Sequence, residues 1–212
     1  MTSSGPIIFV VDDDDAVRDS VTWLLEPLGY EVRGFASAQD FLSAYRFESP
    51  ACLILDVRMP GMSGLELQSR LRANRVEIPI LFITGHADVG TAVRAMKDGA
   101  TDFLEKPFSD QVLLDRVHAC IESDRARNAA TATNHEMFAR YNSLTERQQR
   151  VLELVAQGKA NRDIGAALGI SIKTVEAHRA RLMRRMMAQS MAELVLMADA
   201  CARRKVPRTN TD

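Results

Sequence analysis

Short apolar runs alternate with longer amphipathic stretches through the first half of the chain. The runs that predict strands are Ile7–Val11, Glu31–Phe35, Cys52–Leu55, Ile80–Ile83 and Asp102–Leu104. Apolar residues repeat at helical spacing between and after them, near Asp15–Glu26, Ala38–Arg46, Gly64–Ala73, Val89–Lys97 and Asp110–Glu122. The runs IIFVV, CLIL and ILFI are apolar throughout, which is typical when helices cover both faces of a sheet. The alternation predicts an α/β fold with a doubly wound parallel sheet.

The second half of the chain shows only helical patterns, which start after residue 143. The first helix opens at the capping box Thr145–Gln148, and the last at a second box, Ser190–Glu193. Between them the pattern predicts a short helix ending at Leu168, a turn at Gly169, and a helix from Ile172 to about Arg185 that Ser171 caps. Four short helices with a glycine turn before the third predict a small all-α helix-turn-helix domain.

Residues 123–143, SDRARNAATATNHEMFARYNS, separate these two patterns. The segment is polar and alanine-rich and contains no clear strand. It predicts an inter-domain linker, either a helical extension of the preceding helix or a disordered tether. The expected organisation is a first domain over residues 1–122, a linker over 123–143, a helix-turn-helix domain over 144–200 and a basic tail over 201–212.

The net charge of −1 conceals a strong asymmetry along the chain. Residues 1–124 carry 20 acidic and 11 basic side chains, a net charge of −9, whereas residues 125–212 carry 8 acidic and 16 basic ones, a net charge of +8. An acidic domain joined to a basic one indicates that the second faces a polyanion, although chance segregation of surface charge would give the same counts.

The composition, 46% hydrophobic and 26% charged, is that of a globular protein. No apolar run approaches the roughly 20 residues of a membrane helix. The beginning, MTSSGPIIFVVDDDD, has no basic segment before its apolar run, which four aspartates interrupt, so we expect a cytoplasmic protein without a signal peptide. Cys52, Cys120 and Cys201 are too scattered for a disulfide framework or a metal cluster.

Polar side chains follow four of the predicted strands at the point where each strand ends. Asp12 and Asp13 follow the first strand, Asp56 the third and Thr84 the fourth, and Lys106 comes shortly after the fifth. In parallel sheets functional sites lie at this edge. Clustered carboxylates need a cation, and a hard divalent ion such as Mg²⁺ fits their oxygen ligands. An aspartate beside a metal, a hydroxyl and a lysine can attack phosphorus.

Each of these residues alone also has an ordinary structural explanation. Asp14 or Asp15 caps the first helix, and an aspartate after a strand is commonly such a cap or a turn residue. Thr84 alone would be a turn hydroxyl, and Lys106 alone a surface lysine before Pro107. Their joint placement at successive strand ends favours a functional site.

The motifs at these strand ends resemble those of the receiver domain of bacterial two-component response regulators. The similarity covers about Ile7–Ser123, and the matching motifs are VVDDDD (10–15), LILDVRMPGMSG (53–64), ITGHAD (83–88) and GATDFLEKPF (99–108). The last two are especially similar to the FixJ branch of the LuxR/NarL family. The resemblance implies a flavodoxin-like sheet of five parallel strands in the order 2-1-3-4-5.

The resemblance also implies a role for each residue that matches a motif. Asp56 is then the phospho-acceptor. Mg²⁺ or Mn²⁺ is held by Asp12, Asp13, the Asp56 carboxylate and the main-chain carbonyl of Arg58.

Three further residues match the family's switch and phosphate contacts. Thr84 and Lys106 are implied to contact the phosphoryl oxygens, and Phe103 to be the aromatic residue that moves inward with Thr84. The peptide bond between Lys106 and Pro107 is expected to be cis.

The third helix of the second half separates an apolar face from a polar one. Val175, Leu182 and Met186 share one side and should pack inward. The other side carries small and basic residues that would let the helix approach the DNA major groove and reach phosphates. The candidate DNA-binding residues are Lys173, Thr174, Glu176, Ala177, Arg181 and Arg184. A solvated, salt-bridged face would show a similar pattern.

Residues 144–200 resemble the LuxR/NarL-type helix-turn-helix. The matching segments are LTERQQRVLELVAQGKANRDIGAALGIS (144–171) and KTVEAHRARLMRRM (173–186). Gly165 stands where the family usually has alanine, a difference that we expect to cost the short helix about 0.5–1 kcal/mol.

Together the two resemblances imply a response regulator that takes part in its own phosphoryl transfer and is not a turnover enzyme. Its implied partners are a sensor histidine kinase, double-stranded promoter DNA, RNA polymerase and a second copy of itself, with no membrane. An aspartyl-phosphate enzyme is disfavoured, because a DxDx[TV] motif after the first strand is absent. A phosphorelay or interaction module without DNA binding is the remaining alternative.

Overall fold

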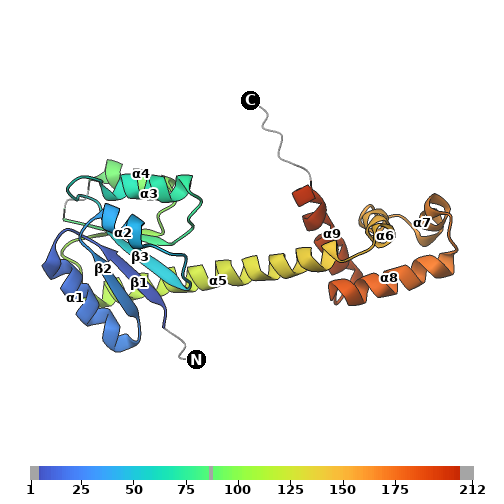
Figure 1. The fold of residues 1–212 in the computed structure, drawn as a ribbon, viewed down its shortest axis with the longest axis horizontal. Coiled ribbons are helices and arrows are strands. Elements are labelled where there is room, and N and C mark those ends of the chain that lie inside the picture. The colour runs from blue at the N-terminus through green and yellow to red at the C-terminus, as the bar shows by residue number, and fades with distance from the viewer. Residues whose placement is uncertain (1–4, 86–87, 206–212) are drawn as a thin grey trace. The chain divides into compact units, whose positions relative to one another are not determined.

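The computed structural model describes residues 5–85 and 88–205, drawn in colour in Figure 1. His86 and Ala87 of the ITGHAD motif, and residues 206–212 of the predicted basic tail (201–212), lie outside the described residues. Residues 201–205 are not a tail, because they form the end of the last described helix, where Cys201 is buried. The chain divides into two compact units, Met1–Ala129 and Ala130–Asp212. Within the described ranges, no helix is both long enough and apolar enough to span a membrane.

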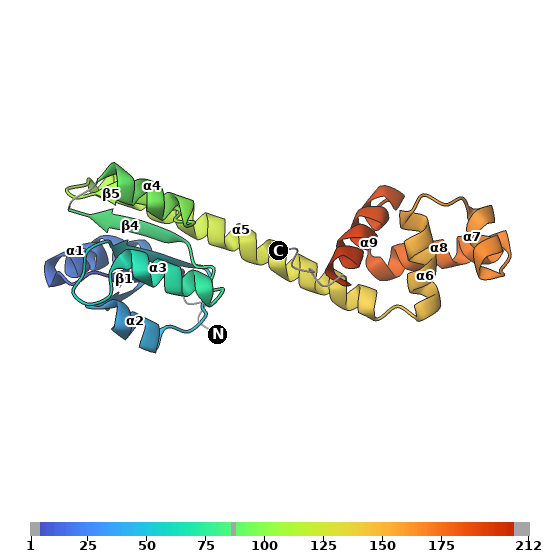
Figure 2. The same ribbon diagram turned by 90° about the horizontal axis from the view of Figure 1, so that it is seen from above.

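The first unit is built on a parallel sheet of five strands (Figures 1 and 2). The strands are β1 (Ile7–Val11), β2 (Glu31–Phe35), β3 (Ala51–Asp56), β4 (Ile80–Thr84) and β5 (Asp102–Glu105). They pair in the order β2-β1-β3-β4-β5. This order confirms the doubly wound, flavodoxin-like fold.

Helices follow the strands and cover both faces of the sheet. They are α1 (Asp15–Leu25), the 3-10 turn η1 (Glu26–Leu28), α2 (Ala38–Ala44), α3 (Gly64–Ala73), α4 (Val89–Lys97) and α5 (Asp110–Asn142). Neighbouring residues of one strand point to opposite faces, so Phe9 packs in the core beneath α2, α3 and α4, and Ile8 in the core beneath α1 and α5. The all-apolar strands are therefore explained by two cores.

Side-chain caps fix the starts of the helices that border the carboxyl edge of the sheet. The Asp14 carboxylate accepts a hydrogen bond from the Ala16 N–H at the start of α1. Ser63 and Glu66 form a complete capping box before α3, and Asp88 caps α4. These caps also hold the loops that follow β1, β3 and β4.

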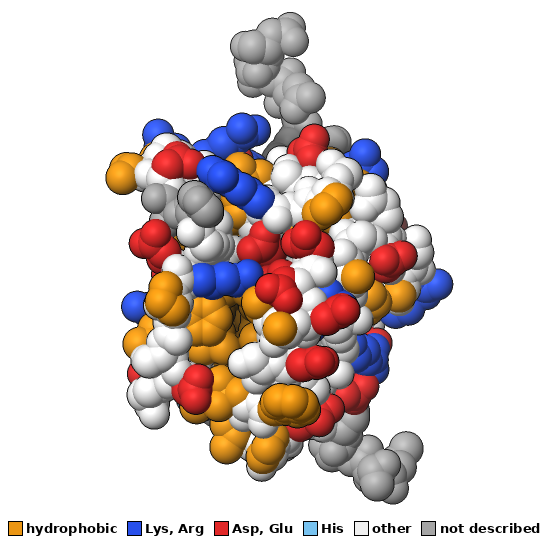
Figure 3. All heavy atoms as spheres, turned by 90° about the vertical axis from the view of Figure 1, so that its left-hand side faces the viewer, with side chains coloured by type: hydrophobic (Ala, Val, Ile, Leu, Met, Phe, Trp, Pro, Cys, Tyr) orange, Lys and Arg blue, Asp and Glu red, His pale blue; other side chains and the backbone are white. Residues whose placement is uncertain are grey.

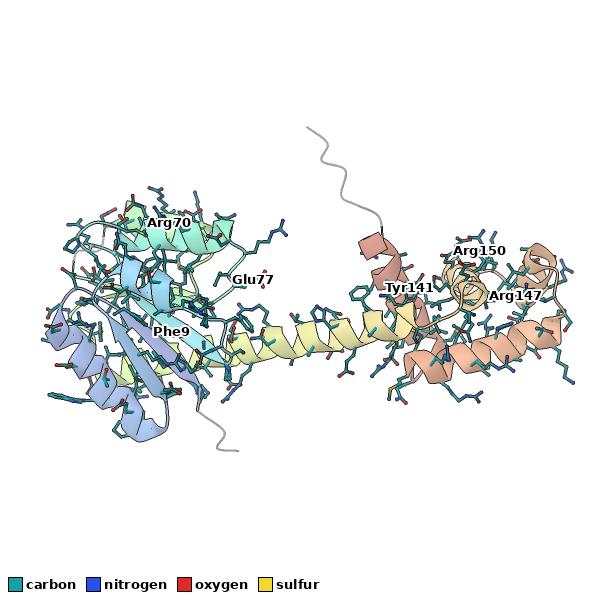
Figure 4. The ribbon with its side chains drawn as sticks, viewed as in Figure 1. Phe9, Arg70, Glu77, Tyr141, Arg147 and Arg150 are labelled. Atoms are coloured by element: carbon teal, nitrogen blue, oxygen red, sulfur yellow. The ribbon has the colours of Figure 1, made fainter. Side chains whose placement is uncertain are left out.

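The second unit packs four helices around a single apolar core. They are α6 (Glu146–Ala156), α7 (Asn161–Leu168), α8 (Ile172–Met186) and α9 (Met191–Lys205). The C-terminal part of α5 contributes Met137 and the labelled Tyr141 of Figure 4 to this core. Residues 123–142, for which the sequence left a helix or a tether open, are helical.

The two predicted capping boxes of this unit differ in the structure. Thr145 and Gln148 form both reciprocal hydrogen bonds. At α9 the Glu193 N–H donates to Ser190, but the Glu193 carboxylate accepts from the N–H of Gln189, one residue earlier than a capping box requires. The second prediction was therefore right about the helix start and wrong about the reciprocal bond.

Candidate functional site

Four of the predicted residues converge at the carboxyl edge of the sheet. Asp12 follows β1, Asp56 ends β3, Thr84 ends β4 and Lys106 follows β5. Because β1, β3, β4 and β5 are successive neighbours, these ends lie side by side. Asp12, Asp56 and Thr84 have exposed fractions of only 1%, 6% and 1%. Polar groups buried to this extent need partners within the site.

The ammonium group of Lys106 joins the two buried carboxylates. Lys106 Nζ lies 2.6 Å from Asp12 Oδ2 and 3.0 Å from Asp56 Oδ1. The other oxygens accept main-chain hydrogen bonds, Asp12 Oδ1 from the Asp14 N–H at 3.0 Å and Asp56 Oδ2 from the Arg58 N–H at 2.6 Å. The site is thus an ion-paired cluster in which the direction of each carboxylate is fixed.

The cluster perturbs the ionisation of its members. Burial raises the pKa of Asp56, and the negative charge of Asp12 adds to this effect, while Lys106 works against it. Burial alone would lower the pKa of Lys106, but its hydrogen bonds to Asp12 and Asp56 outweigh burial and raise that pKa. Lys106 therefore stays charged, whereas the carboxylate of Asp56 is incompletely compensated and would gain from a further cation.

The remaining switch candidates lie on β4 and β5. The Thr84 carbonyl accepts a hydrogen bond of 2.8 Å from the Lys106 N–H, which connects the ends of the two strands. Phe103 is half-buried on β5, with its ring centre 6.3 Å from that of Phe82. The bond between Lys106 and Pro107 is cis, as predicted.

Two close contacts at the site were not predicted from the sequence. The Arg18 guanidinium donates to the main-chain carbonyl of Asp12 at 2.6 Å and also pairs with Asp15. Gly64, the first residue of α3, packs against the main chain of Asp56 so closely that a Cβ atom would lie 2.2 Å from the Asp56 carbonyl oxygen. The sequence offers only one signal for this contact, which is that Asp56 and Gly64 lie in the same motif, LILDVRMPGMSG.

The donor set of the site suits a hard divalent cation. Two buried carboxylates and main-chain carbonyls are the ligand types that Mg²⁺ prefers, and Mg²⁺ usually keeps several waters. Asp13 is exposed beside them. Across the described part of the chain no three acidic, histidine or cysteine side chains gather as metal ligands, so Asp13 does not join Asp12 and Asp56 here as the sequence predicted, and water and main chain would complete the shell. Figure 3 shows acidic side chains gathered on this end of the first unit.

The second unit presents α8 with one face in the core and the other exposed. Val175, Leu182 and Met186 are fully buried, which confirms the predicted inward face. The predicted DNA-binding residues are all exposed: Lys173, Thr174, Glu176, Ala177, Arg181 and Arg184. The Thr174 hydroxyl is 2.8 Å from Ser171 Oγ in the cap of α8. Among the described residues no carboxylate pairs with Lys173, Arg181 or Arg184, so these cations are available to an anion.

Gly165 gives the turn between α7 and α8 its tight geometry. A Cβ atom at this position would lie 2.7 Å from the Ile170 carbonyl oxygen. The Gly165 carbonyl also accepts the Ile170 N–H at 3.0 Å. The sequence suggested only a loss of helix propensity at Gly165, but glycine here allows α7 and the following turn to approach.

A buried aspartate pair joined by lysine on a doubly wound sheet, followed by a helix-turn-helix, defines a receiver-type regulator with a DNA-binding domain. Comparison with known proteins agrees. Residues 8–118 match the response regulator receiver domain, and residues 142–198 match the luxR family of bacterial regulatory proteins. The chain therefore belongs to the family of transcriptional response regulators that join a receiver to a LuxR-type DNA-binding domain.

Individual relatives match over nearly the whole chain. Nodulation protein W of Bradyrhizobium diazoefficiens is 45% identical over 197 residues, which cover 93% of this chain and 87% of that protein. The structure of the response regulator StyR aligns with a TM-score of 0.79 at 44% identity, covering 92% of this chain and 98% of that one. Full-length FixJ from B. japonicum aligns with a TM-score of 0.58 at 41% identity, covering 96% and 99%.

Proposed function

We propose that Asp56 accepts a phosphoryl group from the phosphohistidine of a sensor kinase. The observation that carries this proposal is the Lys106 ammonium held between the buried carboxylates of Asp12 and Asp56. A cation already in contact with the acceptor oxygen can offset charge on the transferred group without reorganisation.

The transfer exchanges one bond to phosphorus for another. A carboxylate oxygen of Asp56 bonds to phosphorus as the bond from phosphorus to the kinase imidazole nitrogen breaks, and the electron pair of that bond leaves with the imidazole. The Arg58 N–H holds Asp56 Oδ2, so the carboxylate cannot rotate freely during attack. Thr84 and Lys106 bind the oxygens of the transferred phosphoryl group.

The metal ligands in this proposal are Asp12, Asp13, Asp56 and the main-chain carbonyl of Arg58. Asp13 is exposed and joins the two buried carboxylates only when the metal binds. When bound, Mg²⁺ or Mn²⁺ supplies positive charge to the phosphoryl oxygens. The four residues lie at or next to the ends of β1 and β3. Asp56 takes up one phosphoryl group and keeps it as the product of the step. The protein therefore acts as a phosphoryl acceptor and not as a turnover enzyme.

Phosphorylation then acts on an equilibrium between two states of the receiver. The new charge favours an inward position of Thr84, and Phe103 follows, which changes the face formed by α4 and β5 and favours a homodimer. The shift is only as large as the preference of the phosphoryl group for the active state.

The DNA-binding step uses the exposed face of α8. In this proposal Lys173, Arg181 and Arg184 contact phosphates, and Thr174, Glu176 and Ala177 face the bases. The functional segments in this proposal are the receiver over residues 1–122, the linker over 123–143, the DNA-binding domain from residue 144 to the end of α9 at Lys205, and the tail beyond it. RNA polymerase is the further partner, and the cytoplasm is the compartment in which kinase and DNA are both reached.

Labelling with radioactive acetyl phosphate and Mg²⁺ tests the acceptor assignment. Wild-type protein should take up label, and Asp56→Asn should not. Asp124→Asn is the matched control, because Asp124 is equally buried but lies on α5 away from the site. Label that persists in Asp56→Asn would contradict the assignment.

A further inference from the structure

A cavity of about 560 Å³ lies in the first unit at the edge of the sheet opposite Asp56. Its lining comes from the C-terminal ends of α3 and α4, the beginning of β4, and α5. The volume falls within the range of about 300–1,000 Å³ that is common for small-molecule sites. No step of the phosphoryl transfer or of DNA binding uses this cavity.

Four basic side chains from different elements line the cavity: Arg72, Arg75, Lys97 and Arg127. Two of them are neutralised by acidic partners. Arg72 lies 3.1 Å from Asp98, and Arg127 pairs with the buried carboxylate of Asp124. These two cations therefore belong to the fold and leave the other two to be explained.

Arg75 and Lys97 have no ion-pair partner among residues 5–85 and 88–205. Lys97 lies in the last turn of α4, where a cation also interacts favourably with the helix dipole. The dipole does not account for Arg75, which follows α3. Glu77 also lines the cavity, but it lies 3.8 Å from the Arg127 guanidinium, so the exposed Arg75 and Lys97 are the two lining cations without an acidic partner among the described residues.

The backbone of Arg75 is held in the left-handed region, at φ +58°. The Val76 N–H bonds to the Leu71 carbonyl at 2.9 Å, as in a Schellman motif, where glycine usually occupies this position. A side chain there is unfavourable by comparison with glycine. Strained residues of this kind cluster at ligand sites, so contact between the guanidinium of Arg75 and a ligand would explain why arginine occupies this position.

Gln68 is one of the residues that line the cavity, and its side chain carries a buried, unsatisfied acceptor. Its side chain is 2% exposed, and Nε2 donates to the Ala95 carbonyl at 3.0 Å. That bond fixes which end of the amide is the oxygen. Oε1 has no hydrogen-bond partner in the described structure. A buried acceptor without a donor is unfavourable, and a ligand N–H or O–H would satisfy it.

We propose that this cavity binds a small phosphorylated metabolite that also carries an N–H or O–H donor, of the kind represented by a nucleoside monophosphate. A phosphate monoester has a charge of about −1.5 to −2 at neutral pH, which matches the two free cations. Arginine is well suited to phosphate because its guanidinium can bind two oxygens at once. The donor of the ligand bonds to Gln68 Oε1.

Titration calorimetry of the full-length protein with adenosine monophosphate tests the site. Wild-type protein should bind it, and Arg75→Gly and Lys97→Gln should each weaken binding by about tenfold or more, as expected for a lost charge-assisted hydrogen bond. Arg75→Gly suits the left-handed backbone, so it should remain at least as stable as wild type and separates binding from folding.

Arg70→Gln is the matched control, because Arg70 lies on α3 but does not line the cavity. Figure 4 labels Arg70 and, on the loop after α3, the cavity residue Glu77. Binding should be unchanged in Arg70→Gln and in Asp56→Asn, which keeps this site distinct from the phosphoryl acceptor. In a spectrum of backbone amides, Gly99 and Thr101 should shift when the ligand is added.

Several results would overturn the proposal. It is wrong if adenosine monophosphate does not bind, or if Arg75→Gly and Lys97→Gln bind as well as wild type. If succinate binds more tightly than adenosine monophosphate, the site does not recognise a phosphate group. If inorganic phosphate binds as tightly as adenosine monophosphate, the N–H or O–H donor of the ligand does not contribute to binding. A Gln68→Met protein with unchanged affinity would also exclude the donor.

Discussion

Gly64→Ala should disturb both stability and phosphoryl acceptance through one steric contact. The new Cβ atom would lie 2.2 Å from the Asp56 carbonyl oxygen, whereas real Cβ contacts essentially never fall below 3.0 Å, so the gap must widen by at least the difference, 0.8 Å. The same Cβ would lie 3.1 Å from Leu55 Cγ. Movement away from Asp56 is therefore resisted by the core, and the acceptor loop has to shift.

The expected magnitude follows from this displacement. Overpacking of this kind costs about 1–3 kcal/mol in the free energy of unfolding. A misplacement of about 1 Å can slow a positioned reaction about 100-fold, so we expect the rate of acetyl phosphate labelling to fall at least tenfold. Both effects share one cause because Gly64 contacts the main chain of the acceptor itself.

Urea denaturation and initial labelling rates would measure the two effects. Gly34→Ala is the control, since its Cβ would lie 3.5 Å from Arg18 Cδ, an ordinary contact. The reasoning is refuted if Gly64→Ala matches wild type in both measurements. Lower stability with a wild-type rate would show that α3 yields instead of the acceptor loop.

Three further variants test other contacts. Lys106→Met should lower the free energy of unfolding by about 3–5 kcal/mol at neutral pH, because the buried carboxylates of Asp12 and Asp56 then face each other without a cation. The loss should shrink as the pH falls through the raised pKa of Asp56, since protonation removes the repulsion. A loss that does not change with pH in urea titrations would contradict this reasoning. Gly165→Ala should destabilise the second unit by about 1 kcal/mol or more, because the steric clash with the Ile170 carbonyl outweighs the gain in helix propensity. Ala166→Gly, at an exposed position of the same helix, measures helix propensity alone, about 1 kcal/mol. A Gly165→Ala protein that is more stable than wild type in thermal unfolding would refute the close contact between Gly165 and Ile170. Arg181→Ala should weaken DNA binding for all sequences and reduce the slope of log affinity against log salt by about 1, and an unchanged slope in titrations would remove Arg181 from the phosphate contacts.

The strand and helix positions of the first unit could be predicted because their apolar patterns are local. Predicted strands agree with observed ones to within one residue at either end, as for Cys52–Leu55 inside Ala51–Asp56. The middle of α5 could not be predicted in this way. Residues 129–136 are all exposed, so this part of the helix has no buried face and its sequence shows no hydrophobic periodicity from which a helix could be predicted.

The candidate site shows a similar division between local and tertiary information. Strand ends alone placed Asp12, Asp56 and Lys106 at one edge of the sheet. That Lys106 bridges both carboxylates depends on the direction of side chains from three strands, which spacing does not encode. The contact of Gly64 with Asp56 likewise joins the start of a helix to the end of a strand only in the folded chain.

The central claim is that phosphorylation of Asp56 controls DNA binding by the second unit. Its most direct test is the affinity of the full-length protein for a genomic fragment, chosen by binding-site selection, before and after treatment with acetyl phosphate and Mg²⁺. We predict that the treatment tightens binding by wild-type protein and leaves the affinity of Asp56→Asn unchanged. Equal tightening in both proteins, or in neither, would contradict the claim.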